Sequence, residues 1–283
     1  MNIDALLSKE QARGTLEYLD RYRKPDVAGL SEFGAVTTAT FARSCILTGR
    51  TGAADIARAR EEAEELAQQI NSHPRPEELE LDPILLIEYF KSLKAVNADT
   101  PAFRNLAGTV AEHFAKAKGA MAKESRMLRL ERLLADVGIG PSPTKINRAF
   151  KECGEMLLEP SEKIAARVDL AIASGENPSP QVAELLAILA LAELRDYRID
   201  FATHILRFLV SSDHIDGFVT EGISFVALQR TREGSYGFFD PLNEQNIDER
   251  QRDSAFRLPV TLNAIWLIKL FSQKMQQKTG SMS

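Results

Sequence analysis

The chain has 283 residues, of which 44% are hydrophobic and 27% are charged. These are the shares of a globular protein, and they exclude a disordered, collagen-like or disulfide-scaffold class. Lys and Arg number 35 against 40 Asp and Glu, and the resulting net charge of −5 argues against a broad nucleic-acid surface. The length lies near the upper limit for one hydrophobic core and suits one large domain or two small ones, of which we predict a single helical domain over residues 1–283.

The sequence favours a reducing, cytoplasmic location. The N-terminus has no basic region followed by a long apolar run, so it does not resemble a secretory signal. The longest aliphatic run, Leu185 to Ala192, falls far short of the ~20 residues that span a bilayer. Both cysteines, Cys45 and Cys153, lie on apolar helical stripes, as buried thiols do. We therefore expect no disulfide and no membrane partner.

Apolar residues recur at steps of three and four along nearly the whole chain, which is typical of amphipathic helices. Ser142-Pro143 and Ser179-Pro180 each supply an N-cap hydroxyl followed by proline at the first helical position. Most connections are short, which favours antiparallel neighbours. The sequence thus predicts an all-α fold of about twelve helices arranged as antiparallel hairpins. The predicted helices are residues 8–23, 33–48, 51–71, 83–95, 102–119, 121–137, 143–158, 160–173, 180–195, 198–212, 217–230 and 256–275.

Four other stretches have predictions of their own. Ala35 to Phe41 and Ile223 to Leu228 contain β-branched and aromatic residues that also fit a short strand. The acidic run Glu61 to Glu65 is typical of a solvated helix face. The polar end of the chain, residues 274–283, is expected to fray.

Residues 223–238 have a more specific pattern. An apolar helix end is followed by Gln229, a few polar residues and then Gly234-Ser235-Tyr236-Gly237. This pattern resembles the repeat of the terpene-cyclase and protein-prenyltransferase superfamily, whose fold is an α/α toroid. The resemblance implies that the Gln and the Gly-x-aromatic turn link an outgoing helix to the next inward one. Tyr236 stands where that repeat commonly has Trp.

The turn chemistry has a physical basis apart from the family. Glycine permits a positive φ where the chain reverses at a helix end. The aromatic ring of Tyr236 is expected to fill the gap between two hairpins, and the Gln229 amide is able to bond carbonyls freed at the helix end. The motif is therefore structural in the first place.

The chemistry of that superfamily is not carried over to this chain. Its terpene cyclases use Asp-rich motifs, and neither Asp-x-Asp-Asp nor Asp-Asp-x-x-Asp occurs here. Its prenyltransferase β-subunits and lanthionine cyclases hold zinc through Cys, His and Asp, whereas Cys45 and Cys153 lack such neighbours. No phosphate-binding glycine loop is present either. We therefore predict no metal site and no cofactor.

His204 is a candidate for acid–base catalysis. Asp200 lies four residues earlier on the same predicted helix, so the carboxylate is placed to orient the imidazole. The alternative is a structural histidine at the edge of the core, which is the commoner situation.

The loop from residue 233 to residue 244 is a candidate ligand site. Aromatic walls, one or two carboxylates and a nearby Arg are what a pocket for an organic ligand requires. In the alternative interpretation Asp240 caps a turn and Arg257 pairs with it. The candidate ligand-binding residues are Tyr236, Phe238, Phe239, Asp240, Glu244 and Arg257.

Two functional hypotheses follow from the sequence. In the first, the chain is an accessory or binding protein of specialised metabolism whose toroid-like scaffold holds an apolar small molecule or a peptide. In the second, it is a metal-independent biosynthetic enzyme with lyase-like or cyclase-like acid–base chemistry, and His204, Tyr236 and Asp240 are the proton-transfer candidates. The lack of metal motifs favours the first. A protein partner or a homo-oligomer is compatible with both.

Overall fold

The computed structural model describes residues 8–22, 32–49, 52–74, 79, 81–121, 125–140, 149–150, 159–237 and 256–280. Helices account for 79% of these residues, and no strand occurs among them. The all-α prediction is therefore confirmed. By proximity of Cα atoms the chain divides into two compact units. One unit comprises Met1–Gly52 and Ala183–Ser283, and the other is Ala53–Val182.

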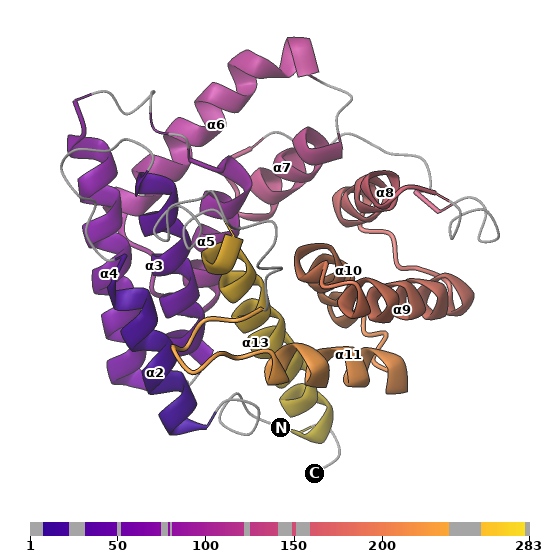
Figure 1. Cartoon of the computed structure of the whole chain (residues 1–283). Coiled ribbons are helices and arrows are strands. Elements are labelled where there is room, and N and C mark those ends of the chain that lie inside the picture. Colours follow the sequence, from indigo (N-terminus) through magenta and orange to yellow (C-terminus); the bar gives the residue numbers. More distant parts are fainter. Residues whose placement is uncertain are drawn as a thin grey trace, which may run out of the picture. The chain divides into compact units, whose positions relative to one another are not determined.

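The first unit joins helices from both ends of the chain (Figure 1). Its helices are α2 (Lys9–Asp20), α3 (Glu32–Gly49), α10 (Ile199–Ser211), α11 (Gly217–Leu228) and α13 (Leu258–Gly280). A further helix, α9 (Pro180–Arg195), begins in the second unit and continues into the first. Figure 1 shows α13, in yellow, beside α3, with which it shares the largest interface in this unit.

The second unit is continuous in sequence. Its helices are α4 (Ala53–Ser72), α5 (Pro83–Ala95), α6 (Pro101–Met121), α7 (Ser125–Asp136) and α8 (Ser161–Ser174). Within it α7 packs against α5 and α8, and α4 packs against α6.

Helix starts follow the capping residues in the sequence. Ser8 and Gln11 form a capping box in which each side chain bonds the backbone of the other. Asp82 precedes Pro83 and accepts a hydrogen bond from Ile84 N at 2.9 Å. The predicted cap at Ser179 is confirmed, because its Oγ accepts from Val182 N at 3.3 Å and α9 begins at the following proline.

Trp266 of α13 is half-buried and contacts side chains from two other helices of the first unit. The ring of Phe41 on α3 lies 5.0 Å from the Trp266 ring, measured between centroids. On the other side, the guanidinium of Arg207 on α10 lies 3.2 Å from the same ring centroid and donates to Asn263 Oδ1 at 3.1 Å. Ring packing and a cation–π contact thus hold α3, α10 and α13 together.

The second unit has a buried ionic cluster. Arg129 of α7 donates to the carboxylate of Glu88 on α5 and, at 2.8 Å, to Asp169 Oδ1 on α8. Burial by itself lowers the pKa of Arg129, but the two carboxylates more than offset this, so the pKa stays above its ordinary value. Arg129 therefore remains charged and ties three helices to one another.

The chain reversal after α11 packs onto α2. Gly234 has a φ of +99° and lies so close to α2 that an added Cβ would be 2.3 Å from the Gly14 carbonyl oxygen. Beside it, Arg230 Nε donates to Thr15 Oγ1 at 3.1 Å, and Arg21 pairs with Glu233 at 3.7 Å. Residues from opposite ends of the chain therefore meet at this turn.

Several sequence predictions are corrected or left open. The strand alternatives are wrong, because Ala35 to Phe41 lies within α3 and Ile223 to Leu228 within α11. Helix α13 continues as far as Gly280, and the fraying of residues 274–283 stays a prediction. Most of the predicted helix 143–158 lies outside the described residues. The single domain over 1–283 stays a prediction, since compact units do not decide whether each folds alone.

None of the helices that the structure describes is both long enough and apolar enough to cross a membrane.

We predict that Gly234→Ala lowers the free energy of unfolding by about 2–4 kcal/mol, because alanine disfavours positive φ and its Cβ would clash with the Gly14 backbone. Chemical denaturation measures the loss. The matched control is Gly217→Ala, since a Cβ at Gly217 meets no atom within 4 Å. The control should stay within ~0.5 kcal/mol of the parent. Equal stability of the two variants would contradict the close approach of the turn to α2.

Candidate functional site

The turn that carries the superfamily resemblance is built by backbone hydrogen bonds. Thr231 N donates to Ser235 O at 2.8 Å, and Gly237 N donates to Gln229 O at 3.0 Å. Gly234 and Gly237 both have positive φ, as the turn chemistry predicts. Arg230 and Tyr236 form an isolated antiparallel bridge across the turn.

Tyr236 is part of the core. Only 1% of its surface is exposed, and its backbone N donates to Thr261 Oγ1 of α13 at 3.0 Å. Its hydroxyl oxygen is buried and has no hydrogen-bond partner in the part of the chain that the structure describes. Burial raises the pKa of the phenol, and Arg230 offsets part of that rise. The ring therefore fills the junction, and the hydroxyl is poorly placed for proton transfer.

Gln229 contributes to the turn differently from the prediction. Its backbone carbonyl, rather than its side-chain amide, accepts the hydrogen bond from Gly237 N. The side chain is 8% exposed, and its Oε1 is buried without a hydrogen-bond partner among the described residues. The expected bond from the amide to freed carbonyls is not what holds this turn.

The other candidates do not form one described site. His204 lies half-buried on α10, and Asp200 one turn earlier on that helix is exposed. Arg257 is half-buried just before α13 begins. Four remaining candidates of the loop lie outside the described residues, so the predicted pocket there stays a prediction. They are Phe238, Phe239, Asp240 and Glu244.

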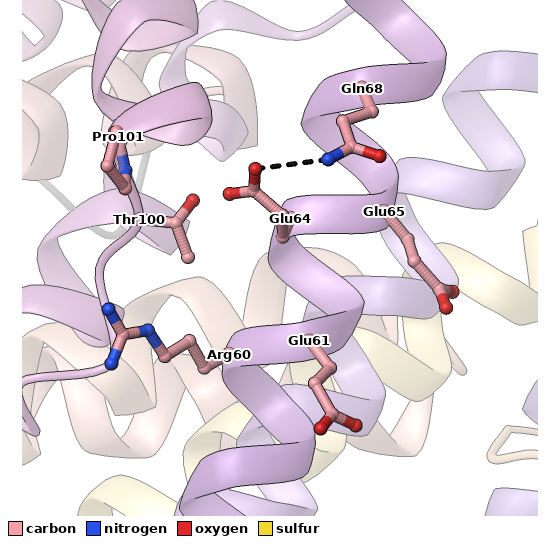
Figure 2. A pocket seen from close by; sticks show the side chains of 7 residues that line it. All are labelled: Arg60, Glu61, Glu64, Glu65, Gln68, Thr100 and Pro101. Carbon is pink, nitrogen blue, oxygen red and sulfur yellow. Dashed lines mark hydrogen bonds between the residues drawn. The ribbon is translucent and has the colours of Figure 1, made fainter.

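A pocket of about 500 Å³ lies in the second unit, between α4 and the start of α6. Its lining residues are Arg60, Glu61, Glu64, Glu65, Gln68, Thr100 and Pro101. Figure 2 shows the Glu64 carboxylate facing Thr100 and the Arg60 side chain reaching toward the same segment. Charges of both signs therefore face the start of α6 from consecutive turns of α4.

Glu64 is the most unusual side chain of the pocket. Its Oε1 accepts a hydrogen bond from Gln68 Nε2 at 3.1 Å, drawn in Figure 2. Its Oε2 is buried and finds no hydrogen-bond partner among the residues that the structure describes. A buried carboxylate oxygen without a partner loses about 1–3 kcal/mol of hydration without replacement. A donor from a bound molecule would satisfy it.

The N-terminus of α6 forms the opposite wall of the pocket. Thr100 is 3% exposed and its Oγ1 accepts from Phe103 N at 3.2 Å, which makes it the N-cap. Next to it, Arg104 donates to Asp99 Oδ2 at 2.5 Å, and this hydrogen bond lowers the pKa of Asp99. Thr100 and Pro101 are thereby fixed against α4.

The acidic run of α4 predicts a solvated helix face, and the pocket beside it is not predicted from the sequence. Glu62 is 5% exposed and accepts from Arg58 Nε at 3.3 Å, and Glu64 is half-buried, so that prediction is wrong for both. A signal was available: Glu62 lies on the same helical stripe as Ala59, Ala63 and Leu66, which are buried.

Side chains able to bind a metal ion do not cluster in the described ranges. No group of three or more His, Cys, Asp or Glu side chains there is placed to hold a metal ion. The predictions of no metal and no cofactor stay predictions.

Comparison with known proteins finds no relative. No family model, no curated protein and no solved structure matches the chain. The resemblance to the terpene-cyclase and protein-prenyltransferase superfamily therefore stays a prediction that rests on the turn residues and the helical fold.

We predict that Tyr236→Ala lowers the free energy of unfolding by about 3–5 kcal/mol, as other aromatic truncations in cores do. Tyr236→Phe should stay near the parent or exceed it, because it removes a buried hydroxyl that the described residues leave unbonded. Urea denaturation of the two variants and the parent measures both effects. An alanine variant as stable as the parent would show that the ring of Tyr236 does not stabilise the fold.

Proposed function

We propose that the chain is a binding or accessory protein, and that the pocket between α4 and α6 holds a basic side chain of a peptide. The observation that carries the proposal concerns Glu64, which lines the pocket: its Oε2 is buried and has no hydrogen-bond partner among the described residues. A lysine ammonium or an arginine guanidinium supplies the charged donor that this oxygen lacks.

The remaining lining supports a peptide rather than a wholly apolar molecule. The exposed ring of Pro101 offers apolar surface for the aliphatic stem of a long basic side chain. Arg60 adds a donor for a backbone carbonyl or carboxylate of the same peptide. The volume lies within the range of about 300–1,000 Å³ that small-ligand sites occupy.

The alternative, a metal-independent enzyme with acid–base chemistry near Tyr236 and Asp240, has less support. The Tyr236 hydroxyl is buried in the core, and its raised pKa makes it a poor acid or base near neutral pH. His204 on α10 stays a candidate, but it does not line the pocket that the structure describes. The cytoplasm remains the proposed location, and the protein that supplies the peptide is the proposed partner.

The test uses lysine capped as its N-acetyl amide, titrated into the full-length protein and followed by ¹H–¹⁵N NMR spectra. We expect shift changes at residues 60–68 and 100–104, and none with capped glutamine. Glu64→Gln should weaken binding roughly tenfold, because it removes a charged acceptor worth about 1.4 kcal/mol or more.

Glu112→Gln is the matched control. It makes the same charge change on α6, at an exposed residue that does not line the pocket. Its affinity should stay within about twofold of the parent, since an exposed charge contributes little. Equal weakening by both variants, or no shift changes with capped lysine, would contradict the proposed function.

A further inference from the structure

The pocket between α4 and α6 contains a carboxylate and a guanidinium from the same helix. Glu64 and Arg60 both line it, and they lie four residues apart, one turn along α4. Figure 2 shows both side chains on the side of α4 that faces Thr100 and Pro101. A ligand in this pocket therefore meets a negative group and a positive group at neighbouring turns of one helix.

The two groups are not bonded to each other. Glu64 accepts from Gln68 Nε2 through Oε1, and its Oε2 has no hydrogen-bond partner among the described residues. Arg60 has no hydrogen bond or ion pair within the described ranges either, whereas Arg58, at the same spacing, pairs with Glu62 at 3.3 Å. Each of the two charges in the pocket is therefore available to a bound molecule.

The separation of the two groups limits the shape of the ligand. Four residues of α-helix rise about 6 Å. The α-amine and the α-carboxylate of a free amino acid are attached to one carbon, so they are too close together to span a full turn. The ammonium of a lysine side chain is separated from the carboxylate of the same residue by a flexible four-carbon stem. A lysine at the C-terminus of a peptide therefore has two charges that reach Glu64 and Arg60 together.

The remaining charges around the pocket allow an anion beside α6. Pro101 opens α6, and the first turn of a helix presents the positive end of its dipole. Asp99, two residues earlier, pairs with Arg104 at 2.5 Å, which offsets its charge. The other carboxylates of the lining, Glu61 and Glu65, are exposed, so solvent and salt screen their repulsion of an anion.

We infer that the pocket takes the C-terminal lysine of a peptide, with its ammonium on Glu64 and its terminal carboxylate on Arg60. This inference rests on the proposed function and adds to it the position of the basic residue in the peptide. A guanidinium binds a carboxylate through two parallel hydrogen bonds. An internal lysine has a neutral peptide amide in place of that carboxylate, so Arg60 distinguishes the two.

The test titrates two isomeric peptides into the full-length protein and follows ¹H–¹⁵N NMR spectra. N-acetyl-Gly-Gly-Lys has its lysine at a free C-terminus. N-acetyl-Lys-Gly-Gly has the same composition and net charge, but its carboxylate is two residues away from the lysine. We expect the first peptide to bind about fivefold more tightly, a modest factor because Arg60 is exposed.

Substitutions at the two charges should have different effects. Arg60→Gln should give the two isomers equal affinity, because it removes the group that recognises the terminal carboxylate. Glu64→Gln should weaken both isomers and leave their ratio unchanged, since both have the ammonium. Arg195→Gln is the matched control and should keep the preference of the parent, because Arg195 is an exposed helical arginine that does not line the pocket.

Equal affinity of the parent for the two isomers would overturn this inference, and binding of capped lysine would then still support the proposed function. A preference that persists in Arg60→Gln would also overturn it. Absence of binding by either isomer and by capped lysine would overturn both proposals. The comparison of isomers uses the unsubstituted protein, so it decides the inference even if a variant fails to fold.

Discussion

Three buried cations, Arg43, Arg129 and Lys269, each bond to a partner on another helix, and the packing of both units depends on those pairings. Burial of a charge without a partner costs several kcal/mol, so a helix that shifts away from the partner loses far more than one contact. Arg43 of α3 is 1% exposed and donates to the Asp20 carboxylate and to Leu16 O of α2. Arg129 of α7 donates to Asp169 of α8 in the second unit, and Lys269 of α13 donates to the Thr48 hydroxyl of α3 in the first.

These pairings explain how an almost wholly helical chain obtains defined registers. Apolar stripes alone tolerate sliding by a turn, whereas a hydrogen-bonded cation has one position that satisfies it. Arg43 places α2 on α3, and the turn at Gly234 then packs onto α2. The proposed function rests on the opposite situation, because the buried Oε2 of Glu64 has no hydrogen-bond partner among the described residues.

The helices and the turn could be predicted from the sequence because their signals are local. Ser179 before a proline marks the start of α9, and the glycines at 234 and 237 mark the reversal. The run of carboxylates predicts a solvated face, whereas Glu62 lies on the buried stripe of α4. The pocket could not be predicted, since Thr100 faces Glu64 only once α4 and α6 have packed.

The most direct test of this account is the stability of Arg129→Met, measured by urea denaturation. The variant leaves Glu88 and Asp169 facing each other without their shared cation, and we expect a loss of about 3–5 kcal/mol. The triple variant Glu88→Leu, Arg129→Met and Asp169→Leu should regain most of that loss. Arg132→Met, an exposed cation on the same helix, should change little. An Arg129→Met variant within ~0.5 kcal/mol of the parent would contradict the claim that buried cations hold the helices in register.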